Sequence, residues 1–438
     1  MTATSPPHPS RNKKWILNAL SMSSPTHVAP EINYWVELAK VLDGNFHALF
    51  IADMLGVYDV YKGPGNIKEV LPGAAQFPIS DPSLPIAAMS SVTKTLSFGI
   101  TALTTYENPF LLARQYATLD HLTNGRVAWN VVTSNLESAA KNLGLEKEIP
   151  HDERYEIADE DDAVVLDESL KAYTHPDRVR KIDHKEKYFN VAGPHLIEPS
   201  RQRTPFIFQA GASQAGKVFE TKHAEAIVLE IRQTAVEQER NINGLKLIVG
   251  MLVIVDETDE LAQRKYSEYL TYADLDGSLA LFGGWTGQDL GPYSDDDDFQ
   301  FTGPGAIQSI VSSWRAMIPG SEGVKWTKRQ VAQELALGGP HPRAIGSAKT
   351  VADILEKWIV ETDVDGFNIS YAVGPGDLDD VVRYLVPELK ARGVFWDPVA
   401  AEGKTTRENY LGDFAKGSRL STDHPGSKYR WATSDDGQ

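Results

Sequence analysis

Short apolar runs rich in Val, Ile and Phe recur along this chain, and segments of mixed polarity separate most of them. A run that is apolar at consecutive positions is typical of a strand buried on both faces, whereas apolar residues at every third or fourth position indicate an amphipathic helix. The apolar runs predict eight strands, at residues 15–20, 46–53, 96–105, 126–134, 205–210, 225–229, 246–255 and 366–370. Helical periodicity is clear at residues 32–42, 109–122, 259–270 and 377–392.

The alternation of these strands with helices decides the fold class. Strands that are apolar on both faces and alternate with helices form parallel sheets, and eight such units close a barrel. We therefore predict an α/β fold, a (β/α)8 TIM barrel that forms a single domain over residues 1–438. An open doubly wound sheet is the alternative, but no G-x-G-x-x-G follows an early strand, as it commonly does in sheets that bind dinucleotides.

Residues 271–345 interrupt the alternation of strands and helices, because they contain many Gly and Pro residues and the acidic run SDDDDF. A structureless loop of this length is unusual in a compact domain, so we predict an insertion between the seventh and eighth strands, with short helices that cap the mouth of the barrel. Within it, Asp295 to Asp298 are expected to form a solvated loop. The polar segment after Trp396 is expected to lie on the surface.

The charge and the absence of cysteine exclude several classes of function. The formal net charge of −17 and the pI near 5.1 argue against nucleic acid and anionic membranes as partners, because both attract clustered Lys and Arg. Without Cys the chain has no disulfide, thiolate nucleophile or Cys-ligated metal, and we expect a cytoplasmic location. No run approaches the roughly 20 apolar residues of a membrane span, and the polar N-terminal segment does not resemble a signal peptide.

Polar residues gather where the predicted strands end, which is the face of a (β/α)8 barrel that carries the reaction site. Asp53 ends the second strand, and Ser213 follows the fifth. The third and fourth strands carry Thr101, Thr104, Thr105, Asn130, Thr133 and Ser134. Each residue could instead cap a helix or satisfy loop backbone groups, so the residues alone leave a ligand site and a structural role equally favoured.

Two short motifs are candidates for holding a cofactor. QAGASQAGK places glycines around Ser213 where a strand gives way to a helix, and the free N–H groups of a helix start suit a phosphate, although an ordinary Ser N-cap explains the same pattern. In HDERYEIADE, His151 and Tyr155 are four residues apart, so a helix would bring both rings to one face, where they either contact a planar cofactor or pack as a pair. No H-E-x-x-H, G-x-S-x-G or P-loop motif is present, and no metal site is expected.

Longer strings distributed over most of the chain carry a family resemblance. They are FHALFIADMLGVYDVY, TALTTYENPFLLARQYATLDHLTNGRVAWNVVTSNLESAAKNLG, HDERYEIADE, FQAGASQAGKVF, HAEAI, DGFNISYAVGPGDLDDVVRYLVPELKARG and DHPGSKYR. Together they resemble the nitrilotriacetate monooxygenase component A family. That family is a branch of the bacterial-luciferase-like flavin monooxygenases and includes dibenzothiophene-sulfone and pristinamycin monooxygenases.

The resemblance implies an FMN-dependent monooxygenase in a barrel of the bacterial-luciferase type. Reduced FMN (FMNH2) would come from a separate NAD(P)H:FMN reductase, and a flavin C4a-hydroperoxide would oxygenate a small organic substrate. The family's FMN positions correspond here to Asp53, Thr101, His151, Tyr155 and Ser213. Ser213 would hold the phosphate with His151 and Tyr155 nearby, and Asp53 and Thr101 would approach the ring. No catalytic residue is assigned, and a homodimer or homotetramer is expected.

The chain departs from the family pattern at three places. Roughly 15 residues are missing between VAPE and INYW, judged by typical loop and helix lengths. A helix that usually continues after YEIADE and a loop that usually follows HAEAI are also shortened. These gaps indicate either a splice form or gene model that lacks internal pieces, or a shortened homologue with impaired flavin binding.

Other functions remain open from the sequence. A non-catalytic relative would bind FMN without forming product, and a deazaflavin-dependent enzyme would transfer hydride on the same barrel, although the branch-specific strings argue against it. A sugar-acting barrel would use a pair of carboxylates such as Asp53 and Glu107. The sequence does not identify the substrate.

Overall fold

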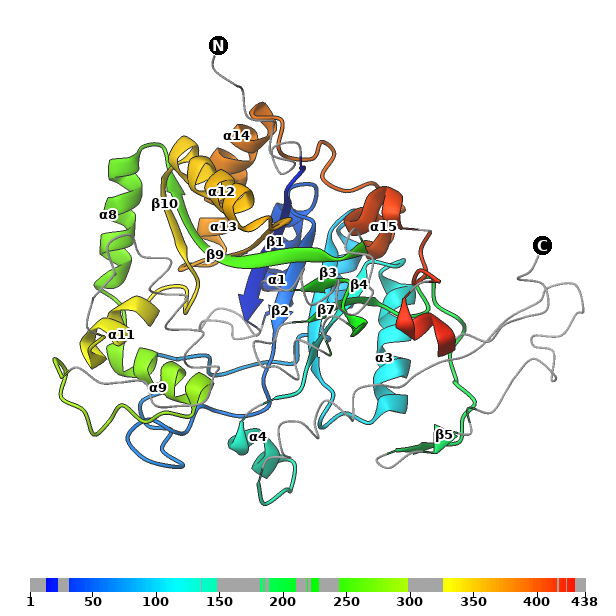
Figure 1. Ribbon diagram of the computed structural model, residues 1–438, viewed down its shortest axis with the longest axis horizontal. Coiled ribbons are helices and arrows are strands. Elements are labelled where there is room, and N and C mark those ends of the chain that lie inside the picture. Colours follow the sequence, from blue (N-terminus) through cyan, green and yellow to red (C-terminus); the bar gives the residue numbers. More distant parts are fainter. Residues whose placement is uncertain are drawn as a thin grey trace, which may run out of the picture.

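The computed structural model describes most of the chain, namely residues 13–22, 31–134, 136–147, 184–185, 189–209, 222–227, 244–297, 326–415, 417–422 and 424–429, with Ile182 and Phe219. Within these residues eight parallel strands close into a barrel (Figure 1). They are β1 (Ile16–Met22), β2 (Ala48–Ala52), β3 (Ser97–Leu103), β4 (Val127–Val132), β7 (Phe206–Gln209), β8 (Ala226–Ile227), β9 (Lys246–Asp256) and β11 (Gly366–Ser370). The order around the barrel is β9, β11, β1, β2, β3, β4, β7 and β8, and β8 pairs again with β9. The predicted TIM barrel is confirmed.

Side chains along the strands alternate between the helix-covered outer face and the barrel interior. On β11, Phe367 and Ile369 belong to the core under the helices, whereas Asn368 between them points inward. Phe50 of β2 and Phe208 of β7 meet inside the barrel with ring centroids 5.4 Å apart. This alternation decides which strand residues can reach a ligand inside the barrel.

The outer layer consists of helices whose apolar stripes face the strands. In chain order it includes α1 (Ile32–Leu42), α2 (Ile86–Ser91), α3 (Pro109–Leu122), α8 (Asp259–Leu270), α12 (Ala348–Thr362), α13 (Gly376–Asp380), the π-helical turn η4 (Val381–Leu385) and α14 (Val386–Ala391). The short helix α4 (Glu137–Asn142) lies at the carboxyl ends of the strands instead, where Ala139 packs in a second apolar core. The bounds of α1, α3 and α8 coincide with the predicted ones. Asn108 shows why α3 begins where it does, because its Oδ1 accepts from the backbone N–H of Phe110 and Leu111, and Pro109 occupies the first turn. None of the described helices is long and apolar enough to cross a membrane.

A ninth parallel strand, β10 (Arg343–Ser347), extends the barrel wall and was not predicted. β9 has 11 residues, and the described part of β8 pairs only with Lys246 and Leu247 at its start. β10 pairs with Leu252–Asp256, the outer half of β9. The chain therefore returns to the barrel wall at the end of the segment that we interpreted as an insertion.

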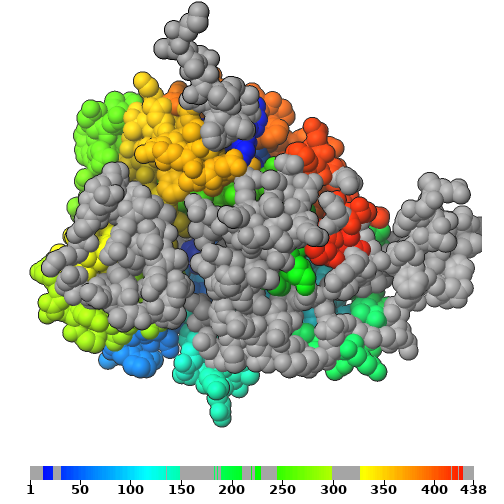
Figure 2. Space-filling model, in the orientation of Figure 1, coloured from blue at the N-terminus to red at the C-terminus, as the bar shows by residue number. Residues whose placement is uncertain are grey.

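A second apolar core covers the carboxyl ends of β2 and β4. The helices α9 (Leu275–Thr286) and α11 (Lys328–Leu335), within the segment 271–345, pack there against residues that follow β2. Tyr58, Tyr61 and Phe282 are among its buried members. In Figure 2 the yellow-green surface of this region adjoins the blue surface of the segment after β2. A small antiparallel pair, β5 (His184–Lys185) and β6 (Asn190–Val191), lies apart from the barrel.

The expectation that the segment after Trp396 lies on the surface is wrong. Its helix α15 (Thr406–Leu411) closes the amino-terminal end of the barrel, and Figure 1 shows it (red) at the opposite end of the strands from α4. Tyr410 enters the barrel, where its hydroxyl donates to Asn18 Oδ1, and Arg407 forms a buried ion pair with Glu225. These polar residues are buried because each finds a polar partner there. The 3-10 turns η5 (Gly412–Phe414) and η6 (Pro425–Tyr429) follow.

Candidate functional site

Thr101 and Asn130 form a polar pair inside the carboxyl-terminal half of the barrel. They are register partners on β3 and β4, and their outer neighbours, such as Ile100, belong to the core under the helices. Asn130 Nδ2 donates to Thr101 Oγ1 at 2.8 Å, and both residues are only 4% exposed. Asn130 Oδ1 has no hydrogen-bond partner among the described residues. The pair thus presents a buried acceptor to whatever enters the barrel mouth.

Asp53 directly follows β2, the strand beside β3, and is partly buried. Its Oδ1 accepts from the backbone N–H of Met54 at 2.8 Å. Because the carboxyl ends of parallel neighbours meet at one rim, Asp53 and Thr101 belong to the same side of the barrel mouth. The structure therefore brings these two predicted site residues together at one rim.

The remaining predicted site residues, His151, Tyr155 and Ser213, lie outside the described part of the chain. Their assignment to the cofactor stays a prediction. Two of the other polar residues at the rim have a structural role, since Thr105 Oγ1 donates to the carbonyl of Thr133 at 2.6 Å.

The wall formed by β1 and β11 also carries polar groups. Asn18 Nδ2 donates to Asn368 Oδ1 at 2.8 Å, between register partners on the two strands. Ser370 lies two residues after Asn368 on β11, nearer the barrel mouth. It is buried, and its hydroxyl has no hydrogen-bond partner among the described residues. Ser21 Oγ and the Tyr371 hydroxyl lie 2.9 Å apart at the same strand ends.

One residue that the sequence did not single out, His341, lies against the inner face of β9. A Cβ atom built on Gly250 would lie 2.2 Å from His341 Nδ1, so the imidazole occupies the space of a side chain at position 250. Burial lowers the pKa of His341 to about 4, so the ring is neutral near pH 7. The motif G-G-P-H-P before a short strand is the available sequence signal, and its two glycines adopt left-handed conformations at Gly338 and Gly339.

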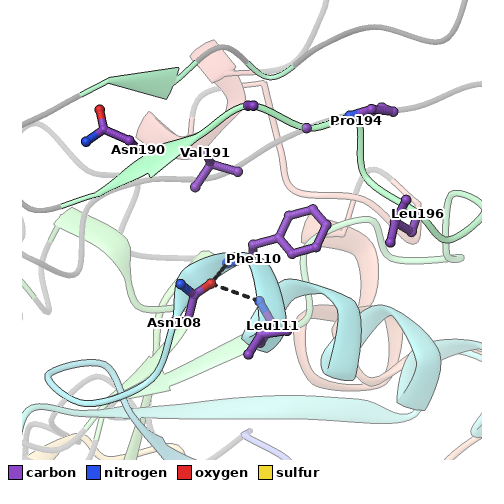
Figure 3. Close-up of a pocket in the computed structure, with 9 residues that line it drawn as sticks. Asn108, Phe110, Leu111, Asn190, Val191, Pro194 and Leu196 are labelled. Atoms are coloured by element: carbon purple, nitrogen blue, oxygen red, sulfur yellow. Dashed lines mark hydrogen bonds between the residues drawn. The ribbon is translucent and has the colours of Figure 1, made fainter.

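A pocket of about 510 Å³ lies outside the barrel, between the start of α3 and the segment that includes β6 (Figure 3). Phe110, Val191 and Leu196 contribute apolar walls, and the Asn108 Oδ1 in its floor is engaged in capping α3. None of its nine lining residues is charged. We therefore do not assign a phosphate-bearing cofactor to this pocket.

Glu107 follows β3 and is the second carboxylate of the sugar-acting alternative. Its pKa is raised by burial and by the negative charge of Asp81. A raised pKa suits a general acid, but a structural carboxylate at a loop start behaves in the same way. Similarity to known proteins decides between a sugar-acting enzyme and a flavin monooxygenase.

Residues 15–358 match the sequence model that describes the luciferase-like monooxygenases. Dimethyl-sulfide monooxygenase of Hyphomicrobium sulfonivorans is 40% identical, over 95% of this chain and 94% of its own. Nitrilotriacetate monooxygenase component A of Aminobacter aminovorans is 30% identical, over 88% and 91% of the two chains. The crystal structure of a long-chain alkane monooxygenase, LadA, superposes with a TM-score of 0.82 at 38% identity, over 95% of this chain and all of the other. The family resemblance is therefore confirmed.

The alignment with dimethyl-sulfide monooxygenase also bears on the three gaps. It extends over 462 positions, although this chain has only 438 residues. The relative therefore contains residues that this chain lacks within the aligned region. This agrees with missing internal segments, and their placement stays a prediction.

Proposed function

This chain belongs to the luciferase-like monooxygenase family, and on that premise we propose that it uses FMNH2 and dioxygen to oxygenate a small organic molecule. The chain is a flavin-dependent monooxygenase, an oxidoreductase that incorporates oxygen from O2. In such a reaction FMNH2, dioxygen and substrate give FMN, water and a product that has gained one oxygen atom from dioxygen. The flavin supplies the reaction with dioxygen, and the protein binds, orients and shields it.

The observation that supports a flavin at the barrel mouth is the buried acceptor Asn130 Oδ1. A buried acceptor without a partner is costly, and a ligand that donates to it recovers that cost. The FMN ring carries an imide N–H that can donate in this way, so the residues present fit the group. Thr101 and Asp53 would flank the ring on the same side of the mouth, as the family resemblance implies.

The phosphate end is proposed for Ser213, His151 and Tyr155. This part of the proposal is supported by the QAGASQAGK motif and by the family positions, since all three lie outside the described residues. A helix start would supply the N–H groups that a phosphate needs in a protein with a net charge of −17.

A separate NAD(P)H:FMN reductase is the proposed source of FMNH2. The chain has no dinucleotide fingerprint after an early strand, so the reduction of FMN is better assigned to another protein. The relative from Aminobacter aminovorans is itself named as component A of its monooxygenase. The expected homodimer or homotetramer and the expected cytoplasmic location are parts of the proposal as well.

The substrate is proposed to be uncharged and weakly polar, such as a thioether or an alkane. The last residues of the eight described barrel strands include neither Lys nor Arg, and they are Met22, Ala52, Leu103, Val132, Gln209, Ile227, Asp256 and Ser370. A polycarboxylate such as nitrilotriacetate would call for cations to pair with its charges. The relatives named for dimethyl sulfide and long-chain alkanes share more identity with this chain than the one named for nitrilotriacetate.

The test is reconstitution with FMN, a flavin reductase and NADH under ¹⁸O2. Dimethyl sulfide, hexadecane and nitrilotriacetate are offered separately, and mass spectrometry measures ¹⁸O in the products. We expect label in one of the first two products and none when the reductase is omitted. FMN binding without labelled product from a broad panel would favour a shortened, non-catalytic homologue. Failure to bind FMN or FMNH2 at all would refute the proposal.

A further inference from the structure

The position of His341 is fixed by the loop that leads into β10. Gly338 and Gly339 have φ values of 72° and 67°, which side chains with a Cβ rarely adopt, and they turn the chain sharply toward the barrel. The carbonyl of Pro342 then accepts from the backbone N–H of Leu252 at 2.8 Å, and the ladder between β10 and β9 begins. His341 is thus anchored directly beside β9.

The inner face of β9 leaves room for this ring only because residue 250 is a glycine. Ile248, two residues earlier, belongs to the core inside the barrel, so position 250 faces inward as well. The atoms nearest to a Cβ built on Gly250 are His341 Nδ1 at 2.2 Å, Cε1 at 2.4 Å and Cγ at 3.0 Å. Nε2 is farther from this point than these three atoms. The imidazole therefore lines the interior, with its Nδ1 edge toward the strand.

The barrel order places His341 across the mouth from the proposed ring-binding residues. β9 and β3 are four strands apart in a closed barrel of eight, so they form opposite walls. Thr101 lies on β3, and Asn130 lies on the neighbouring β4. A ligand that enters the mouth between these walls meets the amide and hydroxyl on one side and the imidazole on the other.

Burial is the one cause of the lowered pKa of His341, so neither a charged group nor a hydrogen bond contributes to it. A neutral imidazole carries one N–H donor and one acceptor, and a site inside a protein normally satisfies both. Asn130 Oδ1 and the Ser370 hydroxyl are buried and lack hydrogen-bond partners within the described interior. Two buried groups without partners and one neutral imidazole around the same mouth point to a polar ligand between them.

We infer that His341 is a cofactor-contacting residue, which hydrogen-bonds the flavin ring from the wall opposite Thr101 and Asn130. This inference rests on the proposed function, because it requires that FMN binds in the barrel mouth. The carboxyl end of the segment 271–345, which contains His341, would then contact the cofactor directly.

The first test is protection of His341 from diethyl pyrocarbonate, which modifies neutral imidazoles. The full-length protein is treated with and without saturating FMN, and modification at each histidine is measured by peptide mass spectrometry. We expect FMN to slow modification of His341 at least fivefold and to leave His121, an exposed histidine that contacts Glu198, unchanged. Equal modification of His341 with and without bound FMN would overturn the inference.

The second test is FMN affinity, measured by flavin fluorescence. His341→Ala should weaken binding about tenfold, His341→Gln should retain part of the affinity through its amide, and His121→Gln should match the wild type. Gly250→Ala should weaken binding as well, because the new methyl group displaces the ring. In the His341→Ala background the same glycine substitution should have no further effect, since no ring remains to be moved.

The outcomes separate this inference from the function on which it rests. If the wild type binds no FMN, the proposed function fails, and the inference fails with it. If the wild type binds FMN but His341→Ala and His341→Gln bind it equally well, only the inference fails. Should His341→Ala not fold, the protection of the wild-type histidine still decides.

Discussion

Replacing Arg407 by methionine should destabilise the protein by about 3–5 kcal/mol, because it leaves the buried carboxylate of Glu225 without its cation. The side chains of the pair are 1% and 4% exposed. Arg407 Nε and Nη2 donate to the two oxygens of Glu225 at 2.6 and 2.7 Å, and its remaining N–H groups donate to backbone carbonyls, including that of Ser418. The expected loss is a large part of the roughly 5–15 kcal/mol by which a typical domain is stable.

Urea unfolding followed by circular dichroism measures this loss. Arg392→Met is the matched control, because Arg392 pairs with partly or fully exposed carboxylates and should contribute about 1 kcal/mol or less. Adding Glu225→Gln to Arg407→Met removes the unpaired charge and should recover part of the stability. If Arg407→Met costs no more than Arg392→Met, α15 does not close the barrel end as described.

Three further predictions concern pH and the cofactor. His47 is buried with a pKa near 4, below its ordinary value of about 6.5, so the unfolded chain binds the proton first, and this residue should lower stability by about 2 kcal/mol between pH 7 and pH 5. Urea unfolding at both pH values checks this: His47→Phe should reduce the pH-dependent loss by about 2 kcal/mol and leave the similar contribution of His341. Asn130→Ala should weaken FMN binding about tenfold in a fluorescence titration, and equal affinity would remove Asn130 from the site. In a melt it should cost only about 1 kcal/mol, because removal of the unsatisfied Oδ1 offsets part of the loss of the hydrogen bond from Nδ2 to Thr101. Ser213→Asp should keep the melting temperature, since Asp caps helices as well as Ser does, and should weaken FMNH2 binding tenfold or more through repulsion of the phosphate; unchanged affinity would place the phosphate elsewhere.

Local patterns were sufficient where the sequence encodes both the element and its ends. α3 is predicted at its observed bounds because its apolar periodicity follows an Asn-Pro pair that starts a helix. β11 is likewise predicted at its observed bounds, since Gly366 opens a short run in which Phe367 and Ile369 supply the apolar face toward the helices.

Tertiary pairing decides the elements that the sequence did not predict. β10 is a five-residue run with a glycine in it, and it forms a strand because β9 extends beyond the pairing with β8. α15 is polar in composition, and its burial depends on partners such as Glu225 and Asn18, which lie far away in the chain. No window of local sequence contains these partners.

In the candidate site, too, some residues were predictable from local sequence and others depend on tertiary contacts. Thr101 was predictable because its parity on β3 turns the side chain into the barrel near the carboxyl end, and Asp53 because it directly follows the end of β2. His341 comes from neither a barrel strand nor a predicted helix, and it reaches the interior only where Gly250, 91 residues earlier, leaves the wall open. A glycine at an inward position of a strand is therefore a signal in its own right. It marks a place where another part of the chain, or a ligand, takes the space of the absent side chain.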